Sequence, residues 1–150
     1  MPWIIFTAIV WLFIIVFLGG RDIKKYWTAG IWAGLLIFFL TYTLMIKDSF
    51  IFQEHLFDLN GLPAEYLAAA VGIGIILIRF LPEEQGLQFA YLILFALGLT
   101  ALEYFALTYE YIEYLEWSLT YSFFYKLIAL IAITWLSNLT VKQERRFIFK

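Results

Sequence analysis

The stretch YWTAGIWAGLLIFFLTYTLMI, residues 26–46, decides the fold class because its 21 residues include no charged side chain. A helix that crosses the hydrocarbon core of a bilayer needs about 20 apolar residues, with a usual range of roughly 17–25. Hydrocarbon offers no hydrogen-bond partner to free backbone groups, so a segment this apolar must be helical there. Residues 26–46 therefore predict one transmembrane helix.

Four further stretches have the same apolar character, and none contains more than two charged residues. Their continuous apolar runs differ from the alternating pattern of a transmembrane barrel strand. We therefore expect an all-α fold, a polytopic membrane helix bundle with five transmembrane helices. The predicted spans are residues 2–19, 26–46, 62–81, 87–109 and 117–139.

The composition agrees with lipid as the main solvent of the chain. Of the 150 residues, 64% are hydrophobic, 21% are aromatic and only 15% are charged, whereas a soluble domain is about 45–50% apolar and about 25% charged. A single soluble domain of this length cannot bury so much apolar surface. The abundance of Leu, Ile and Phe also excludes disorder. No linker or low-complexity stretch divides the chain, which predicts one integral membrane domain over residues 1–150.

The chain contains no cysteine and a single histidine, His55. The missing cysteines exclude disulfides and thiolate metal sites, and one histidine excludes a two-histidine metal site within one chain. The formal net charge of −2 provides no basic field for nucleic acid. No Ser–His–Asp set, P-loop or HExxH motif is present. We therefore expect no cofactor, no metal site, no catalytic residue and no nucleic-acid partner.

The basic residues are distributed unevenly between the predicted loops. Eight of the ten lie on one side of the membrane: Arg21, Lys24, Lys25, Arg79, Lys142, Arg145, Arg146 and Lys150. Lys47 alone lies in a loop on the other side. The positive-inside rule then predicts an N-terminus outside and a C-terminus in the cytoplasm. Residues 2–19 lack a basic n-region and a small-residue cleavage pattern, so we expect a retained span and no signal peptide there.

Glu103 and Lys126 are the charged residues that lie deep inside predicted spans. Such a group costs roughly 2.5–3.5 kcal/mol on insertion scales, so it normally faces the protein interior and pairs. A short connection makes the last two spans antiparallel neighbours, and the two residues then differ in depth by about one helical turn. The spacing predicts an intramembrane charge pair that clamps the two helices. The alternative is a proton or substrate site.

The predicted outer loops are acidic. Their candidate outer acidic patch consists of Glu54, Asp58, Glu110, Glu113 and Glu116. The last three are spaced three residues apart and would share one face of a helix. Spaced carboxylates can bind Ca²⁺ or Mg²⁺, but the chain has no EF-hand pattern, so a solvated acidic face is favoured. The apolar residues of the loop 47–61 would allow a short amphipathic helix in the outer interface.

Small residues recur at intervals of four in two of the predicted spans. They are Gly30 and Gly34 in the second span, and Ala68 and Gly72 in the third. This spacing lets helix backbones approach closely. It serves packing within the bundle or packing against a partner helix equally well.

Five short motifs follow one another along almost the whole chain: Asp22-x-x-Lys25-Tyr26, Phe39-Leu40-Thr41-Tyr42, Phe80-Leu81-Pro82, Glu103 with its aromatic neighbour, and Trp117-x-x-x-x-Ser122. In this order they resemble a family of small uncharacterised multi-pass membrane proteins of spore-forming Gram-positive bacteria. The resemblance implies the five-span layout and a bacterial plasma membrane. It implies no activity.

Three functions remain open at this point. The favoured one is a structural or interaction component of the plasma membrane, whose partners are the lipid bilayer and other membrane proteins or a second copy of the chain. The first alternative is a small cation- or proton-coupled transporter, or an oligomeric channel, that uses Glu103 and Lys126. The second is an intramembrane enzyme acting on lipid. A hydrated cavity at Glu103 would favour the alternatives, and a dry, direct pair would favour the structural role.

Overall fold

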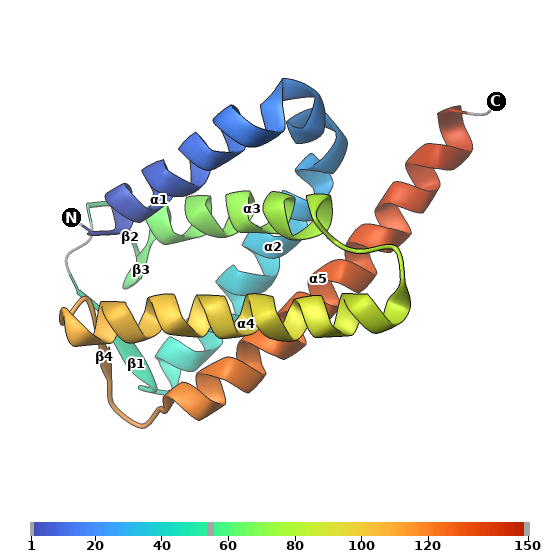
Figure 1. Ribbon diagram of the computed structural model, residues 1–150. Helices are drawn as coiled ribbons and strands as arrows, with labels where there is room; N and C mark the ends of the chain where they lie inside the picture. Colours follow the sequence, from blue (N-terminus) through green and yellow to red (C-terminus); the bar gives the residue numbers. More distant parts are fainter. Residues whose placement is uncertain (1, 54–55, 149–150) are drawn as a thin grey trace.

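A computed structural model describes residues 2–53 and 56–148 of the chain, and it is mostly helical. Within these residues it contains the α-helices α1 (Pro2–Phe13), α2 (Gly19–Ile46), α3 (Ala64–Arg79), α4 (Gln85–Thr108) and α5 (Leu119–Ile148), with a π-helical segment, η1 (Ile14–Leu18), between the first two. Short strands lie at one end of the helices (Figure 1). They are β1 (Phe50–Phe52), β2 (Asp58–Leu59), β3 (Leu62–Pro63) and β4 (Ile112–Tyr114).

Among the described residues, three helical segments are long and apolar enough to cross a membrane: Pro2–Ile46, Gln85–Thr108 and Leu119–Thr140. The helical fold predicted from the apolar stretches is confirmed to this extent. α3 is equally apolar but has only 16 residues, slightly fewer than the roughly 17–25 of a usual span.

The first apolar segment changes direction at Gly19. Its φ of 71° and ψ of 171° lie outside the helical region, and glycine adopts them without the steric cost that a Cβ would bring. Figure 1 shows α2 running back from this point, away from the line of α1. Pro2–Ile46 therefore consists of two helices that meet at a glycine.

Several element boundaries differ from the predicted spans. The expected loop at residues 20–25 forms the first turns of α2, so its basic residues lie on a helix. α3 begins at Ala64, because Leu62–Pro63 pairs with β2. α5 continues to Ile148, beyond the predicted end at 139. Apolar length marks the part of a helix that lipid can surround, whereas polar turns can extend the same helix into water.

The connections at the strand end form two small sheets. β1 pairs antiparallel with β4, and β2 pairs antiparallel with β3. The sequences FIF and IEY of β1 and β4 contain the aromatic and β-branched residues that favour strands. The short interfacial helix considered for residues 47–61 is therefore wrong for the described part of that loop.

α3 packs closely against both α1 and α2. A Cβ at Gly72 would come within 2.6 Å of Cγ1 of Val10 on α1, and a Cβ at Gly30 on α2 would come within 2.9 Å of the Val71 carbonyl oxygen. Gly34 faces the same valine. At Ala68, the backbone carbonyl accepts a 3.0 Å hydrogen bond from the indole Nε1 of Trp11. The candidate packing residues therefore lie at contacts inside this bundle.

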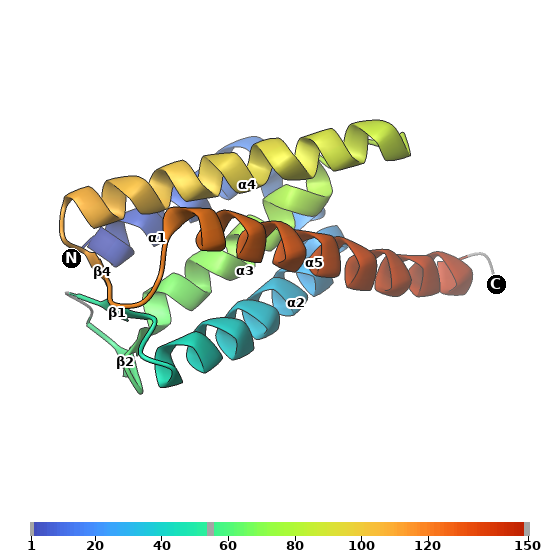
Figure 2. The ribbon, with the colours of Figure 1, turned by 90° about the horizontal axis from the view of Figure 1, so that it is seen from below.

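α4 occupies a different environment. It packs mainly against α5 and against β4, and Figure 2 shows α5 lying between α4 and α2. Of the 24 residues of α4, all of which the structure describes, only Leu92 and Ala96 are buried. Most of α4 is therefore open to its surroundings.

Candidate functional site

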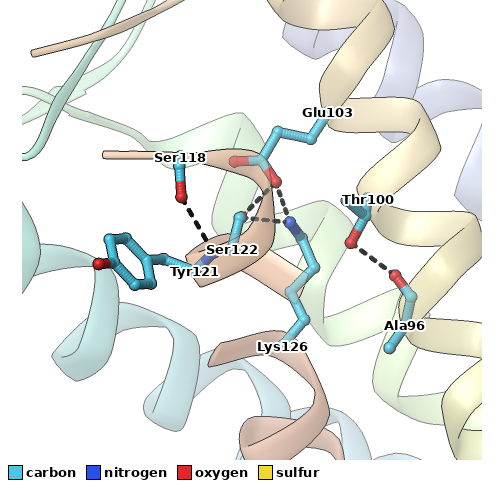
Figure 3. A network of polar contacts seen from close by, with 7 residues as sticks. All are labelled: Ala96, Thr100, Glu103, Ser118, Tyr121, Ser122 and Lys126. Carbon is cyan, nitrogen blue, oxygen red and sulfur yellow. Dashed lines mark hydrogen bonds and ion pairs between the residues drawn. The ribbon is translucent and has the colours of Figure 1, made fainter. Parts of the chain in front are cut away.

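α4 and α5 place Glu103 and Lys126 side by side inside the bundle (Figure 3). The Lys126 ammonium group forms an ion pair with Oε2 of Glu103, and the two side chains are only 15% and 14% exposed. Lys126 Nζ also donates a 2.7 Å hydrogen bond to Oγ of Ser122, one turn earlier on α5. The Ser122 hydroxyl donates to the same Glu103 oxygen. These three side chains, the polar trio, satisfy one another.

This geometry limits the chemistry of the polar trio. A serine beside a lysine resembles the nucleophile and base of a Ser–Lys hydrolase. Here, however, Lys126 Nζ donates to Ser122 Oγ, and the Ser122 hydroxyl donates to Glu103. The serine proton is therefore directed at the carboxylate, which differs from the arrangement of a Ser–Lys nucleophile and base.

A cavity of about 390 Å³ adjoins the polar trio and is lined by side chains from all five helices. Most of its lining is apolar, while Glu103, Ser122 and Lys126 contribute to its polar part. Small-molecule sites in proteins have volumes of roughly 300–1,000 Å³ and combine an apolar wall with a few placed polar groups. The chain thus combines a direct charge pair with a cavity that reaches it.

The cavity opens between α1 and α4. Ile5 and Ile9 of α1 are each 61% exposed, and Leu102 and Phe105 of α4 are 49% and 59% exposed. All four also line the cavity, so they mark its mouth. At the strand end, Phe52 is buried, but Tyr109, in the turn after α4, also lines the cavity and is 64% exposed. The mouth therefore extends along α4 as far as the strand end.

Two buried hydrogen-bond donors on the cavity wall have no partner among the described residues. They are Nε1 of Trp117 and the hydroxyl of Tyr125. The Tyr125 hydroxyl approaches Thr41 on α2 without reaching hydrogen-bond geometry. An unsatisfied buried donor costs about 1–3 kcal/mol, and most buried polar groups in native proteins are paired. Neither atom has accessible surface toward the cavity, so both lie behind its wall and do not face a molecule inside it.

Tyr114 approaches the polar trio from β4. Its hydroxyl is buried, and burial together with the nearby Glu103 charge raises the pKa of this hydroxyl above its ordinary value of 10. The tyrosine is therefore uncharged at neutral pH. The sequence pattern did not identify Tyr114 as a site residue. In the segment YIEY, residues 111–114, Tyr114 lies on the same face of the strand as the buried Ile112.

The candidate outer acidic patch is not a helical face. Asp58 lies on β2 and Glu113 on β4, while Glu110 and Glu116 lie in the turns on either side of β4. Glu54 lies outside the described residues, as does His55. The prediction of one helical face for 110, 113 and 116 is wrong because this segment alternates inward and outward as a strand. In the described ranges no three His, Asp or Glu side chains come together as a metal site.

Glu65, in the first turn of α3, is a buried carboxylate that is 9% exposed. Its Oε1 accepts hydrogen bonds from the backbone N–H groups of Leu56 at 3.0 Å and Phe57 at 3.3 Å. Its backbone carbonyl accepts a 2.6 Å hydrogen bond from Oγ1 of Thr7. Glu65 therefore ties the loop and α1 to the start of α3. The sequence signal for Glu65 is its position in the first turn of a helix after Pro63, because a helix N-terminus favours negative charge.

The fold and the site together define a class of protein. It is a helical protein with segments suited to a membrane, and it holds a compensated charge pair beside an apolar cavity. Comparison with protein-family models, curated proteins and solved structures finds no match for the chain.

Proposed function

We propose that this protein is an integral component of a bacterial plasma membrane, with a structural or interaction role there. The observation that carries the proposal is the placement of the Glu103–Lys126 ion pair. It lies inside the bundle, while large apolar side chains such as Phe17, Leu94 and Ile128 are 71%, 68% and 68% exposed. This is the distribution that hydrocarbon demands, because intramembrane charges face the protein interior and pair.

The proposal includes five membrane crossings, with the N-terminus outside and the C-terminus in the cytoplasm. The change of direction at Gly19 supports separate first and second spans. α3 is short for a span, but α1 and α2 flank it, so protein surrounds much of its backbone. Asp22 at the start of α2 and Arg79 at the end of α3 form a 2.7 Å ion pair. This contact brings two predicted cytoplasmic segments to the same end of the bundle.

The structural role centres on the attachment of α4. Few residues of α4 are buried, and its carboxylate at Glu103 is bound by two groups on α5. Hydrocarbon provides no hydrophobic force between helices, so packing and polar contacts must hold them. The polar trio therefore acts as the clamp between α4 and α5.

Single-cysteine labelling tests the topology cleanly, because the chain contains no cysteine of its own. We expect Asp58→Cys and Glu113→Cys to react with a membrane-impermeant maleimide in intact cells. Glu84→Cys and Lys142→Cys should react only after the membrane is opened. The cysteine-free chain is the control for background labelling. Reaction of Lys142→Cys in intact cells, or of all four positions on one side, would overturn the topology.

Cation- or proton-coupled transport is the second candidate, and the contact of Glu103 with the cavity favours it. Purified protein in liposomes with a trapped pH-sensitive dye distinguishes transport from a structural role. Transport predicts dye responses that the folded double variant Glu103→Leu/Lys126→Met loses. A structural role predicts equal responses for that variant, the parent chain and empty liposomes. Catalysis on lipid has less support, because the Ser122 hydroxyl donates its hydrogen bond to Glu103 and not to Lys126.

A further inference from the structure

We propose that the first turns of α2 bind the headgroup of an anionic phospholipid, and that an acyl chain of this lipid lies along the apolar flank of the same helix. The headgroup meets three cations, which we call the basic turn: Arg21, Lys24 and Lys25. The chain meets four apolar side chains, which we call the apolar stripe: Trp27, Ile31, Leu35 and Phe39. This inference rests on the proposed membrane location, and it adds to that location a preferred lipid and the residues that recognise it.

The basic turn carries positive charge that is left uncompensated by the carboxylate beside it. All three of its side chains are exposed, and none forms an ion pair with another described residue. Asp22 is the only acidic residue of α2, and its carboxylate is bound at 2.7 Å to Arg79 of α3. Guanidinium and ammonium groups bind phosphate oxygens through charge-assisted hydrogen bonds. The basic turn is therefore suited to the phosphodiester of a lipid headgroup.

The apolar stripe continues from the basic turn toward the middle of α2. Its four side chains are spaced four residues apart and are between 44% and 62% exposed. Lys24 precedes the first three of them by three, seven and eleven residues, a spacing that keeps these side chains on one face of a helix. From Lys24 to Leu35 the helix rises about 16 Å, close to the roughly 15 Å of one half of the hydrocarbon core. One phospholipid can therefore contact both the basic turn and the apolar stripe.

α4 provides a comparison at the same end of the bundle, opposite the strands (Figure 1). Its exposed large apolar side chains begin at Leu87, shortly after two exposed carboxylates, Glu83 and Glu84. These carboxylates repel an anionic headgroup. The last turns of α5 lie at the same end, and their sequence adds three cations: Lys142, Arg145 and Arg146. Charge therefore favours an anionic lipid beside α2 and disfavours one beside the start of α4.

Other ligands meet only part of these requirements. A free phosphate ion would bind the basic turn but would leave the apolar stripe uncovered. A phosphatidylcholine would cover the stripe, but its quaternary ammonium group has the same sign of charge as the basic turn. An acidic protein segment in water would meet the cations but not the stripe. These differences define the competitors and controls for a binding experiment.

Fluorescence quenching by brominated lipids tests the inference in vesicles. Because the chain contains no cysteine, a single bimane label can be attached at Leu35→Cys on the apolar stripe or at Leu94→Cys on α4. These leucines are 45% and 68% exposed. The labelled full chain is reconstituted in mixtures of phosphatidylglycerol and phosphatidylcholine, with bromine on the acyl chains of one lipid at a time.

The two labelled positions should differ in lipid preference. At Leu35→Cys we expect an apparent affinity for phosphatidylglycerol about fivefold or more above that for phosphatidylcholine, since one basic residue near an anionic lipid has about this effect. At Leu94→Cys we expect no preference for phosphatidylglycerol. In both chains phosphatidylcholine alone should quench the label, because both positions face hydrocarbon.

Charge variants in the Leu35→Cys chain locate the headgroup. We expect Arg21→Gln/Lys24→Gln/Lys25→Gln to lower the preference to about one, and Lys24→Gln alone to lower it in part. Lys47→Gln is the matched control, because it removes an exposed lysine at the other end of α2, and it should retain the preference. High salt should weaken the preference, whereas millimolar glycerol 1-phosphate should leave it unchanged.

The possible failures give different results. A triple variant that keeps the preference would overturn the inference, as would a preference that glycerol 1-phosphate abolishes. Equal quenching by the two lipids at Leu35→Cys would also overturn it while leaving the membrane location intact. Absence of quenching by either lipid at both positions would overturn the membrane location and this inference with it.

Discussion

The two sides of this bundle, α1–α3 and α4–α5, are held together in different ways. Eight of the 16 residues of α3 are buried, but only two of the 24 residues of α4 are buried, in a helix that the structure describes completely. On the α3 side, glycines bring helix backbones into contact. On the α4 side, the main polar contact is one carboxylate bound by Lys126 and Ser122.

This difference explains where the cavity lies. Glycines bring the backbones of α2 and α3 into close contact, whereas a helix held through long polar side chains can lie farther from its neighbours. The cavity accordingly opens beside α4 and reaches Glu103. The tightly packed side provides a rigid scaffold, and the loosely packed side provides the site. Substitutions on the two sides should therefore change the melting temperature by different amounts.

The largest effect is expected from breaking the charge pair on the loose side. Lys126→Met leaves the Glu103 carboxylate buried and unpaired, which costs about 3–5 kcal/mol. We expect a large loss of monodisperse protein in detergent and a much lower melting temperature. The double variant Glu103→Leu/Lys126→Met removes the lone buried charge but also the clamp, so it should recover only part of the loss.

Lys47→Met is the matched control, because Lys47 lies in an exposed turn at the end of α2. It should behave like the parent chain. A double variant as stable as the parent chain would show that the instability comes from one lone buried charge, and that the pair is not the clamp that holds α4.

The next effect is expected from crowding the tight side. A Cβ at Gly74 would already come within 2.8 Å of the Ala29 carbonyl oxygen on α2, and overpacking typically costs about 1–3 kcal/mol. We expect Gly74→Leu to lower the melting temperature of the purified protein clearly.

Gly98→Leu is the same substitution on α4, where a Cβ would meet nothing within 4 Å. It should leave the melting temperature unchanged or raise it slightly, because leucine favours helix more than glycine does. Equal losses at Gly74 and Gly98 would abolish the distinction between the two sides.

The sequence predicts the helical regions well, because the length of an apolar run follows directly from the thickness of hydrocarbon. It also predicts which charges are deep, and the structure places Glu103 beside Lys126. It does not reveal the strands at residues 50–52 and 112–114, since their pairing joins segments that are far apart in the chain. The cavity is equally hidden, because it depends on how far α4 stands from α1.

A smaller effect is expected for the ion pair between Asp22 and Arg79 on the tight side. Its side chains are 23% and 42% exposed, and solvent screens such pairs to about 0–1 kcal/mol. Asp22→Asn should therefore change the melting temperature far less than Lys126→Met does, and the change should shrink at high salt. A loss as large as that of Lys126→Met would show that the tight side also depends on charge.

At neutral pH, Tyr114→Phe should leave the protein as stable as the parent chain or slightly more stable, because it removes a buried hydroxyl that has no hydrogen-bond partner among the described residues. Above pH 10 the two chains should diverge. The pKa of this hydroxyl is raised in the folded protein, so the unfolded chain ionises first and the parent protein loses stability as pH rises from about 10 toward the folded pKa. The phenylalanine variant lacks this loss. The difference in melting temperature between the two chains should therefore stay constant from pH 8 to about 10 and then grow in favour of Tyr114→Phe up to about pH 11.5. A constant difference over the whole range would mean that Tyr114 is solvated, and that β4 does not shield the Glu103 side of the bundle from water.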